Sequence, residues 1–219
     1  MRLFLASQDF GNFGDKLSEM VGDNRRALVI FNARDHKDGD RGIEKQKQIF
    51  ADAGLEFNEL DLRNYFDRKD ELQQFIDEFK PGLVVLLGGN TFLLRRALAQ
   101  SGFDEILIDD IKADKYVYAG HSAGSMIVAP SLKGFERLDN EKIVVSGYNP
   151  EVIWSGLNIT DIRVIPHVSS DKYREQIVKM RTELFDSKGW RYELLEDEDV
   201  FVVDGDEEVV LRGGSNGIN

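Results

Sequence analysis

The sequence predicts a doubly wound α/β protein, in which a mainly parallel sheet carries helices on both faces. Short apolar runs rich in β-branched residues alternate along the chain with amphipathic stretches. Several of these runs, above all LVVLL at 83–87, lack polar alternation and should be buried on both faces, as parallel strands are. The length of 219 residues suits a single core. We therefore expect one domain over residues 1–219.

Each element follows from its own pattern. Strands are expected at six apolar runs, 2–7, 26–33, 55–62, 83–89, 116–120 and 162–168. Helices are expected where apolar residues recur at helical spacing, at 43–53, 69–79, 91–100 and 173–187. A further helix begins in AGSMIVAP, and Pro130 can end it.

The last 30 residues predict a different arrangement. YELLE, VFVVDG and EVVLRGG are short strands joined by acidic turns, which predicts an antiparallel meander at one edge of the sheet. Nine carboxylates lie between Glu193 and Glu208, and we expect them to keep that edge solvated. The final RGGSNGIN is expected to be a loose tail.

Composition excludes several classes of function. With no cysteine, the chain has no disulfide, no cysteine-ligated zinc and no thiolate nucleophile. The formal net charge of −12 opposes binding to nucleic acid or to an anionic membrane. No apolar run approaches the roughly 20 residues that cross a bilayer, and the first strand is too short for a signal peptide. We expect a cytoplasmic protein that needs no metal or cofactor.

One pentapeptide, Gly120-His121-Ser122-Ala123-Gly124, has the form of a nucleophile elbow. It follows a predicted strand and opens a predicted helix, which is the context that the elbow requires. The flanking glycines permit the sharp turn that lifts a serine hydroxyl above the sheet. A glycine-rich turn of this kind can also serve close packing or phosphate binding. Ser122 is thus the candidate nucleophile.

The candidate base is one of three histidines. His121 adjoins Ser122 and should point away from it, and His36 lies in the charged loop NARDHKDGDRG, whose role stays open. His167 follows the apolar run IRVIP at the carboxyl end of its predicted strand. Ligands bind at that edge of an open α/β sheet, so His167 is the preferred base.

A carboxylate must orient the base, and two backbone N–H groups must hold the oxyanion. A long segment follows His167, which argues against the Ser, acid, His order of α/β-hydrolases. The acidic stretch LLEDEDVFVV offers Asp197, Glu198 and Asp199. Ala123 supplies one N–H, and Gly89 in LLGGN is its natural partner.

The motifs GGNT and GHSAGSM, about 30 residues apart, followed by a Pro-His pair, resemble the serine peptidase family of dipeptidase E and cyanophycinase. The resemblance covers nearly the whole chain. It implies a flavodoxin-like fold, similar to the class I glutamine amidotransferase domain. That domain uses a cysteine, which is absent here, so glutaminase chemistry is excluded.

The resemblance also implies roles for particular residues. Ser122 becomes the nucleophile and His167 the base, with Gly89 and Ala123 in the oxyanion hole. The family acid lies in a Leu-x-acid turn before an apolar strand. Asp197 matches that turn and is the first choice, while Glu198 stays open if the register shifts by one residue.

Two residues are candidates for substrate binding, Asn90 in the GGN loop and Arg174 in YREQIVKM. Aspartyl dipeptidases of the family hold the substrate's N-terminal aspartate through an arginine at a similar helix start, and a guanidinium can bind a carboxylate bidentately. The segment from His167 to Arg174 is shorter than the family loop. A role limited to pairing along the helix therefore stays open for Arg174.

These inferences predict a metal-independent serine peptidase that cleaves small peptides, above all dipeptides with an N-terminal aspartate. We expect a monomer or a homodimer. A small esterase or amidase, or a cyanophycinase-like hydrolase, would use the same residues, although the chain has no insertion to hold a long polymer. A non-catalytic binding module is the alternative from another class.

Overall fold

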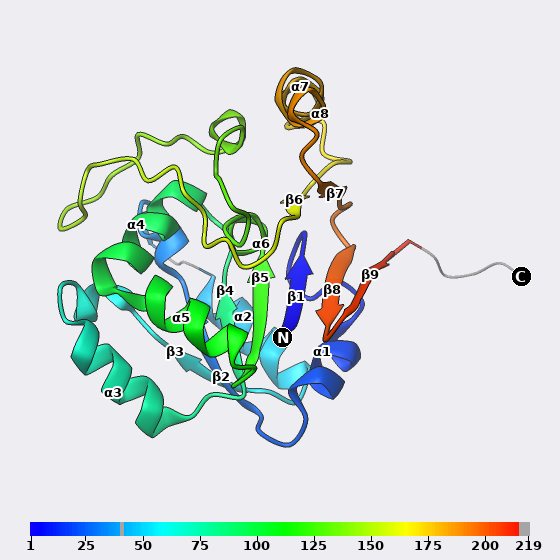
Figure 1. Ribbon diagram of the computed structural model, residues 1–219. Coiled ribbons are helices and arrows are strands. Elements are labelled where there is room, and N and C mark those ends of the chain that lie inside the picture. The colour runs from blue at the N-terminus through cyan, green and yellow to red at the C-terminus, as the bar shows by residue number, and fades with distance from the viewer. Residues whose placement is uncertain (40–41, 215–219) are drawn as a thin grey trace, which may run out of the picture.

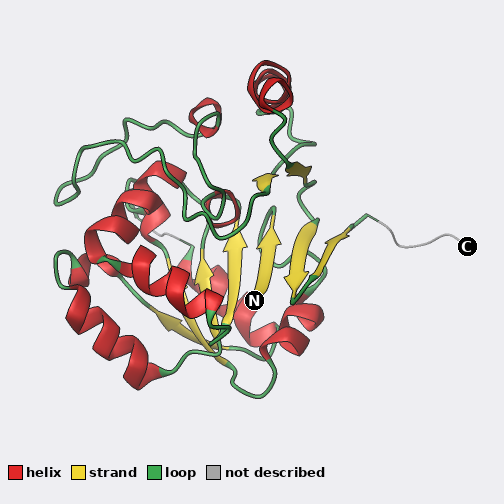
Figure 2. Cartoon of the chain, in the orientation of Figure 1, coloured by secondary structure: helices red, strands yellow, loops and turns green. Residues whose placement is uncertain are grey.

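A mainly parallel sheet runs through the middle of the protein and carries helices on both faces (Figures 1 and 2). The computed structural model describes residues 1–39 and 42–214. The strands in this part of the chain are β1 (Arg2–Ala6), β2 (Arg26–Ile30), β3 (Glu56–Glu59), β4 (Leu83–Leu86), β5 (Val117–His121), β6 (Arg163–Ile165), β7 (Tyr192–Leu194), β8 (Val200–Asp204) and β9 (Glu207–Leu211).

The α-helices of the same residues are α1 (Gly14–Val21), α2 (Ile43–Asp52), α3 (Lys69–Phe79), α4 (Thr91–Ser101), α5 (Phe103–Lys112), α6 (Ala123–Met126), α7 (Arg174–Met180) and α8 (Asp186–Lys188). Short 3₁₀ turns are η1 (Asn32–Arg34), η2 (Leu62–Tyr65) and η3 (Phe135–Arg137), and a π-helical turn, η4 (Arg181–Phe185), joins α7 to α8. No helix of the described residues is long and apolar enough to cross a membrane.

Seven of the described strands form the main sheet, in the order β3-β2-β4-β5-β1-β8-β9. Strands β1 to β5 pair in parallel, whereas β8 runs antiparallel to β1 and β9 antiparallel to β8. The doubly wound α/β class with antiparallel C-terminal strands is therefore confirmed.

Alternate residues of the central parallel strands β1, β2, β4 and β5 enter two separate cores. In β2, Leu28 and Ile30 pack in the core that α3, α4 and α5 cover, while Ala27 and Val29 pack in the core that α1 and α2 cover (Figure 1). All four side chains are fully buried. Burial on both faces explains why these strands read as continuous apolar runs.

The predicted strand over 162–168 is shorter than expected and lies outside the main sheet. It forms β6, which pairs in parallel with β7 in a separate two-stranded sheet. β1 is already hydrogen-bonded on one side to β5 and on the other to β8, which leaves no free edge beside it. The expectation that YELLE joins an antiparallel meander was therefore wrong. Only β8 and β9 form that hairpin, and the small sheet lies above the carboxyl ends of the main strands (Figure 1).

Helices α1 and α5 were not expected from the sequence. Helix α5 begins directly after α4, and Gly102 between them adopts a left-handed conformation with φ of 72°. The serine-glycine pair at 101–102 is the local signal for this break. The N-terminal helix buries Leu17, Met20 and Val21 against the sheet.

The carboxyl ends of β1, β2, β4 and β5 share one edge of the sheet, because these strands are parallel and adjacent. The segments that leave this edge are the β1–α1 loop, η1, the Gly88–Gly89 turn and the turn at Ser122. This edge is where an open α/β sheet binds its ligands.

Candidate active site

Ser122 lies on a strained turn between β5 and α6. Its φ of 49° and ψ of −103° fall in a region that non-glycine residues rarely adopt. A side chain is excluded at both flanking glycines, because a Cβ on Gly120 would lie 2.4 Å from the Gly124 carbonyl oxygen and a Cβ on Gly124 would lie 2.0 Å from the Leu86 oxygen. The turn is fixed to β1 by a 3.0 Å hydrogen bond from the Ser122 N–H to the Ala6 oxygen.

The Ser122 hydroxyl begins a chain of hydrogen bonds through an imidazole to a carboxylate. His167 Nε2 lies 3.0 Å from Ser122 Oγ, and His167 Nδ1 lies 2.7 Å from Asp197 Oδ1. The imidazole is mostly buried and the Asp197 side chain is 48% exposed. Tyr173 stacks on the imidazole, with ring centroids 6.0 Å apart. The structure thus brings together the three residues that the sequence predicts.

His167 is held in place by Ser7, which the sequence does not predict. The His167 N–H donates to Ser7 Oγ over 2.9 Å, and the Ser7 hydroxyl donates to the Leu195 oxygen over 3.4 Å. Ser7 therefore links the end of β1 to the loop of the base and to the turn of the acid. His167 itself has a positive φ of 59°.

Among the acidic candidates, only Asp197 contacts the imidazole. Glu198 accepts a 3.0 Å hydrogen bond from the Asn12 side chain. The Asp199 carboxylate turns inward and is 5% exposed. It accepts hydrogen bonds from the N–H groups of Glu196 and Gly213, each over 3.0 Å, and from the Arg212 guanidinium over 2.6 Å. Asp199 thus holds the turn that presents Asp197. The expected loose tail is anchored here at Arg212, and its residues 215–219 lie outside the described part.

Asp199 makes the turn sensitive to acid. Burial raises the pKa of this carboxyl, but the hydrogen bonds from Arg212 and the two backbone N–H groups outweigh burial and leave the pKa below its ordinary value. A lowered pKa stabilises the fold above the ordinary value near 4, and this stabilisation disappears as the pH falls through the folded value.

We expect Asp199→Asn to lower the free energy of unfolding at pH 7 by about 1–3 kcal/mol, the usual contribution of charged hydrogen bonds. Urea unfolding at pH 7 and pH 3 measures the effect, and the variant should lose less stability on acidification than wild type. Asp206→Asn, in the exposed β8–β9 turn, is the matched control. An equal response of both variants to pH would contradict this role.

The two predicted oxyanion donors lie beside Ser122. The N–H groups of Gly89 and Ala123 donate to no carbonyl among the described residues. At Gly89 the chain passes so close to η1 that a Cβ would lie 2.3 Å from the Ala33 oxygen. The glycine is therefore required for close packing, and its N–H stays available to a ligand.

A cavity of about 310 Å³ opens at Ser122 and His167. Its volume lies at the small end of the range for ligand sites. Arg34, Lys37 and Lys45 also line it. The charged loop NARDHKDGDRG thus contributes Arg34 and Lys37 to this cavity. Its residues 40–41 lie outside the described part. Arg34 donates to the Gly88 oxygen over 2.7 Å.

His121 borders the same cavity but is unsuited to act as the base. The residue is 2% exposed, and its ring packs edge-on against Phe10, with centroids 5.0 Å apart. Burial lowers the pKa of His121 to about 4, although nearby Asp9 opposes this shift. The imidazole is therefore neutral at neutral pH and accepts protons poorly.

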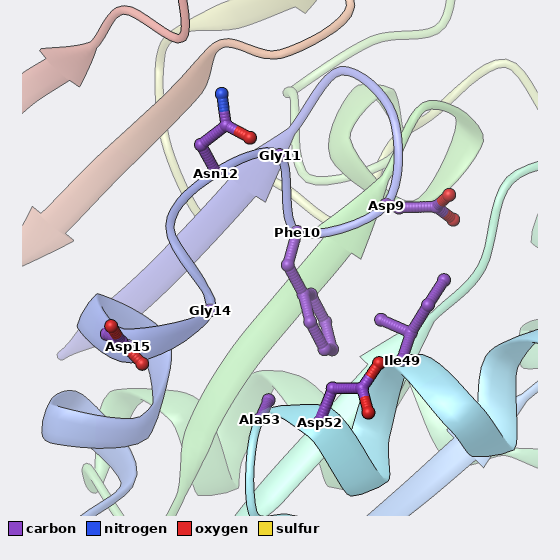
Figure 3. A pocket seen from close by; sticks show the side chains of 9 residues that line it. All are labelled: Asp9, Phe10, Gly11, Asn12, Gly14, Asp15, Ile49, Asp52 and Ala53. Atoms are coloured by element: carbon purple, nitrogen blue, oxygen red, sulfur yellow. The ribbon is translucent and has the colours of Figure 1, made fainter. Parts of the chain in front are cut away.

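A larger cavity of about 400 Å³ lies between the β1–α1 loop and α2. Figure 3 shows the Phe10 ring pointing between this loop and the helix, toward Ile49 and Asp52. Asp9 lines both cavities. Neither Ser122 nor His167 is among the described residues that line the larger one, so the candidate active site is the smaller cavity.

The two predicted substrate-binding residues are engaged by the protein itself. Asn90 is 3% exposed and caps α4, accepting from the Leu93 N–H over 2.8 Å and donating to the Asn140 oxygen over 2.9 Å. Arg174 pairs with Asp171 over 2.8 Å, and its side chain is 68% exposed. Neither Asn90 nor Arg174 is among the described residues that line the cavity at Ser122.

Comparison with known proteins gives consistent results. The family model of peptidase family S51 matches residues 3–210. An uncharacterized peptidase of Listeria monocytogenes is 28% identical over 161 residues, which cover 73% of each chain. An uncharacterized peptidase of Pasteurella multocida is 28% identical over 185 residues, covering 82% of this chain and 83% of its own.

Solved structures share the fold. A crystal structure of a candidate peptidase E protein from Listeria monocytogenes has a TM-score of 0.78 at 24% identity, covering 96% of this chain and 98% of its own. The structure of a peptidase from an acI-B1 Actinobacterium has a TM-score of 0.62 at 18% identity, covering 97% and 94%.

Fold and family together define the class, a serine-type peptidase on a doubly wound α/β sheet. Within that class, the chain belongs to peptidase family S51. The predicted resemblance to peptidase E is confirmed.

Proposed function

We propose that this peptidase is a dipeptidase whose catalytic triad is Ser122, His167 and Asp197. The observation that supports this most strongly is the continuous hydrogen-bonded chain, 3.0 Å from serine to imidazole and 2.7 Å from imidazole to carboxylate. These distances lie within the reach that proton transfer between nucleophile and base requires.

In the proposed reaction, Ser122 Oγ bonds to the scissile carbonyl carbon while His167 Nε2 takes the hydroxyl proton. The N–H groups of Gly89 and Ala123 hold the negative oxygen of the tetrahedral intermediate. The C–N bond then breaks, and His167 gives its proton to the leaving amine. Water hydrolyses the acyl-enzyme with His167 again as base, which regenerates the Ser122 hydroxyl. Asp197 holds the imidazole with Nδ1 protonated and stabilises the imidazolium.

A small, acidic substrate fits the cavity best. A volume of about 310 Å³ suits a small ligand rather than a long polymer. Although the chain carries a net charge of −12, Arg34, Lys37 and Lys45 line this cavity against a single aspartate, Asp9. Lys45 pairs with Asp9 over 2.8 Å, whereas Lys37 has no ion-pair partner among the described residues. These cations favour carboxylates. A dipeptide carries one at its C-terminus, and an aspartyl dipeptide carries a second on its N-terminal residue, so the cavity supports dipeptides and especially aspartyl ones.

Labelling with a fluorophosphonate probe tests the nucleophile. Wild type should react, and Ser122→Ala should not. A folded wild type that stays unlabelled would contradict the proposal. A hydrolysis panel of aspartyl dipeptides, neutral dipeptides and p-nitrophenyl esters tests the substrate class. Rapid ester cleavage without turnover of any dipeptide would favour a small esterase.

One substitution tests the predicted role of Arg174 in substrate binding. Its ion pair with Asp171 is exposed, and such pairs contribute about 0–1 kcal/mol. From the position that it occupies, we expect Arg174→Ala to change kcat/KM for aspartyl and neutral dipeptides equally and by less than about threefold. Steady-state kinetics on both substrates measures this. A loss confined to aspartyl dipeptides would establish the predicted role.

A further inference from the structure

A second, much smaller cavity also opens at the candidate nucleophile. Its volume is about 40 Å³, and Ser122, Gly89 and His167 line both this cavity and the 310 Å³ cavity. Met126 and Leu138 provide apolar wall. This volume accepts a group the size of one or a few water molecules and no further residue of a peptide.

Asp139 contributes the one carboxylate among the described residues that line this small cavity. One of its oxygens, Oδ2, accepts hydrogen bonds from the Thr91 N–H over 2.9 Å and from the Thr91 hydroxyl over 2.6 Å. The other oxygen, Oδ1, accepts no hydrogen bond from any residue in the described ranges. The carboxylate is therefore fixed at the start of α4 with one oxygen left for a ligand.

Burial supports a cationic ligand at this position. Burial raises the pKa of Asp139, while the hydrogen bonds from Thr91 oppose this shift. A desolvated carboxylate gains more from a cation than an exposed one does. An ammonium group in the small cavity would restore the favourable environment that Asp139 loses on burial.

The charges that line the two cavities are complementary to those of a dipeptide with a free ammonium and a free carboxylate. The 40 Å³ cavity carries Asp139, and the 310 Å³ cavity carries Arg34, Lys37 and Lys45. Ser122 and Gly89, where the scissile carbonyl would lie, belong to both. In a dipeptide the ammonium lies on one side of the scissile carbonyl and the C-terminal carboxylate on the other.

We infer that Asp139 binds the N-terminal ammonium of the substrate in the small cavity beside Ser122. The inference rests on the proposed peptidase function and specifies it further. Because the small cavity has no room for another residue, the enzyme removes a single residue from a free N-terminus. Asp139 is then a determinant of specificity, distinct from the triad.

Binding to catalytically blocked protein tests the inference. On a Ser122→Ala background, isothermal titration calorimetry compares alanyl-leucine with propionyl-leucine, which differs only in lacking the amine. A third ligand, acetyl-lysyl-leucine, carries its ammonium on a side chain. Asp139→Asn removes the charge and keeps an oxygen that accepts from Thr91. Glu141→Gln removes a carboxylate from the same loop outside the cavity lining and is the matched control.

With Asp139 intact, alanyl-leucine should bind roughly 10- to 100-fold more tightly than propionyl-leucine, the range expected for a hydrogen-bonded charge pair. Asp139→Asn should abolish this preference, and Glu141→Gln should retain it. Acetyl-lysyl-leucine should bind no better than propionyl-leucine, since its amine cannot enter the small cavity.

Three results would overturn the inference. The first is a preference for alanyl-leucine that persists in Asp139→Asn. The second is an equal loss of affinity for alanyl-leucine and propionyl-leucine in that variant, which indicates a structural role. The third is that neither ligand binds when Asp139 is intact. Failure of the proposed function would appear separately, as a wild type that is not labelled by fluorophosphonate and cleaves no dipeptide. The ligand-binding ratio tests Asp139 in either case.

Discussion

Replacing His167 by alanine is expected to lower kcat for peptide hydrolysis by about 10⁵-fold or more, the loss typical of a base in a serine hydrolase triad. His167 Nε2 lies 3.0 Å from Ser122 Oγ, so its removal leaves the hydroxyl without a proton acceptor. The fold should survive, because alanine also carries a Cβ and adds no strain at the positive φ of this position. Steady-state kinetics, with circular dichroism and thermal melting as checks on folding, measures the effect.

The double variant Ser122→Ala/His167→Ala provides the control. Residues that act as one unit show strongly non-additive losses, so the double variant should be no slower than either single variant. Losses that multiply would contradict a shared mechanism for Ser122 and His167.

Asp197→Asn is expected to lower kcat by about 10³-fold. Replacing a buried triad aspartate by asparagine costs roughly 10⁴-fold, since the imidazole then takes the wrong tautomer. Asp197 is 48% exposed, and water that reaches His167 Nδ1 should moderate the loss. Kinetics on the best dipeptide from the hydrolysis panel measures the loss.

Glu198→Gln is the matched control for this prediction. Glu198 is the neighbouring residue that the sequence left open as the acid, and its carboxylate lies beside Asn12 instead of His167. The variant should retain nearly full activity. A large loss in Glu198→Gln with little loss in Asp197→Asn would reverse the assignment of the acid.

The parts of the site that the sequence predicts are those that depend on local geometry. Ser122 and its flanking glycines form one turn, and the requirement for glycine at 120 and 124 comes from contacts within a few residues or with the adjacent strand. The same holds for Gly89 after β4. Such constraints require particular residues at close spacing, and a single sequence therefore shows them as a recognisable motif.

The parts that the sequence does not predict depend on partners far along the chain. Ser7 contacts the backbone of His167, 160 positions away, and nothing near Ser7 in the sequence signals this contact. Asp139 is placed by hydrogen bonds to Thr91 from an irregular segment. The separation of β6 from the main sheet follows from β8 occupying the edge of β1, which a pattern of apolar residues cannot show. Arg174 has a suggestive motif, yet in the structure its guanidinium pairs within its own helix start.

The turn that carries Asp197 is held from both directions along the chain. Asn12, from the loop after β1, contacts Glu198, and Arg212, beyond β9, contacts Asp199. A chain folded only as far as α6 would possess the Ser122 elbow but no acid to orient its base. Hydrolytic competence is therefore a long-range property that arises only when distant segments dock, and activity reports the completion of folding.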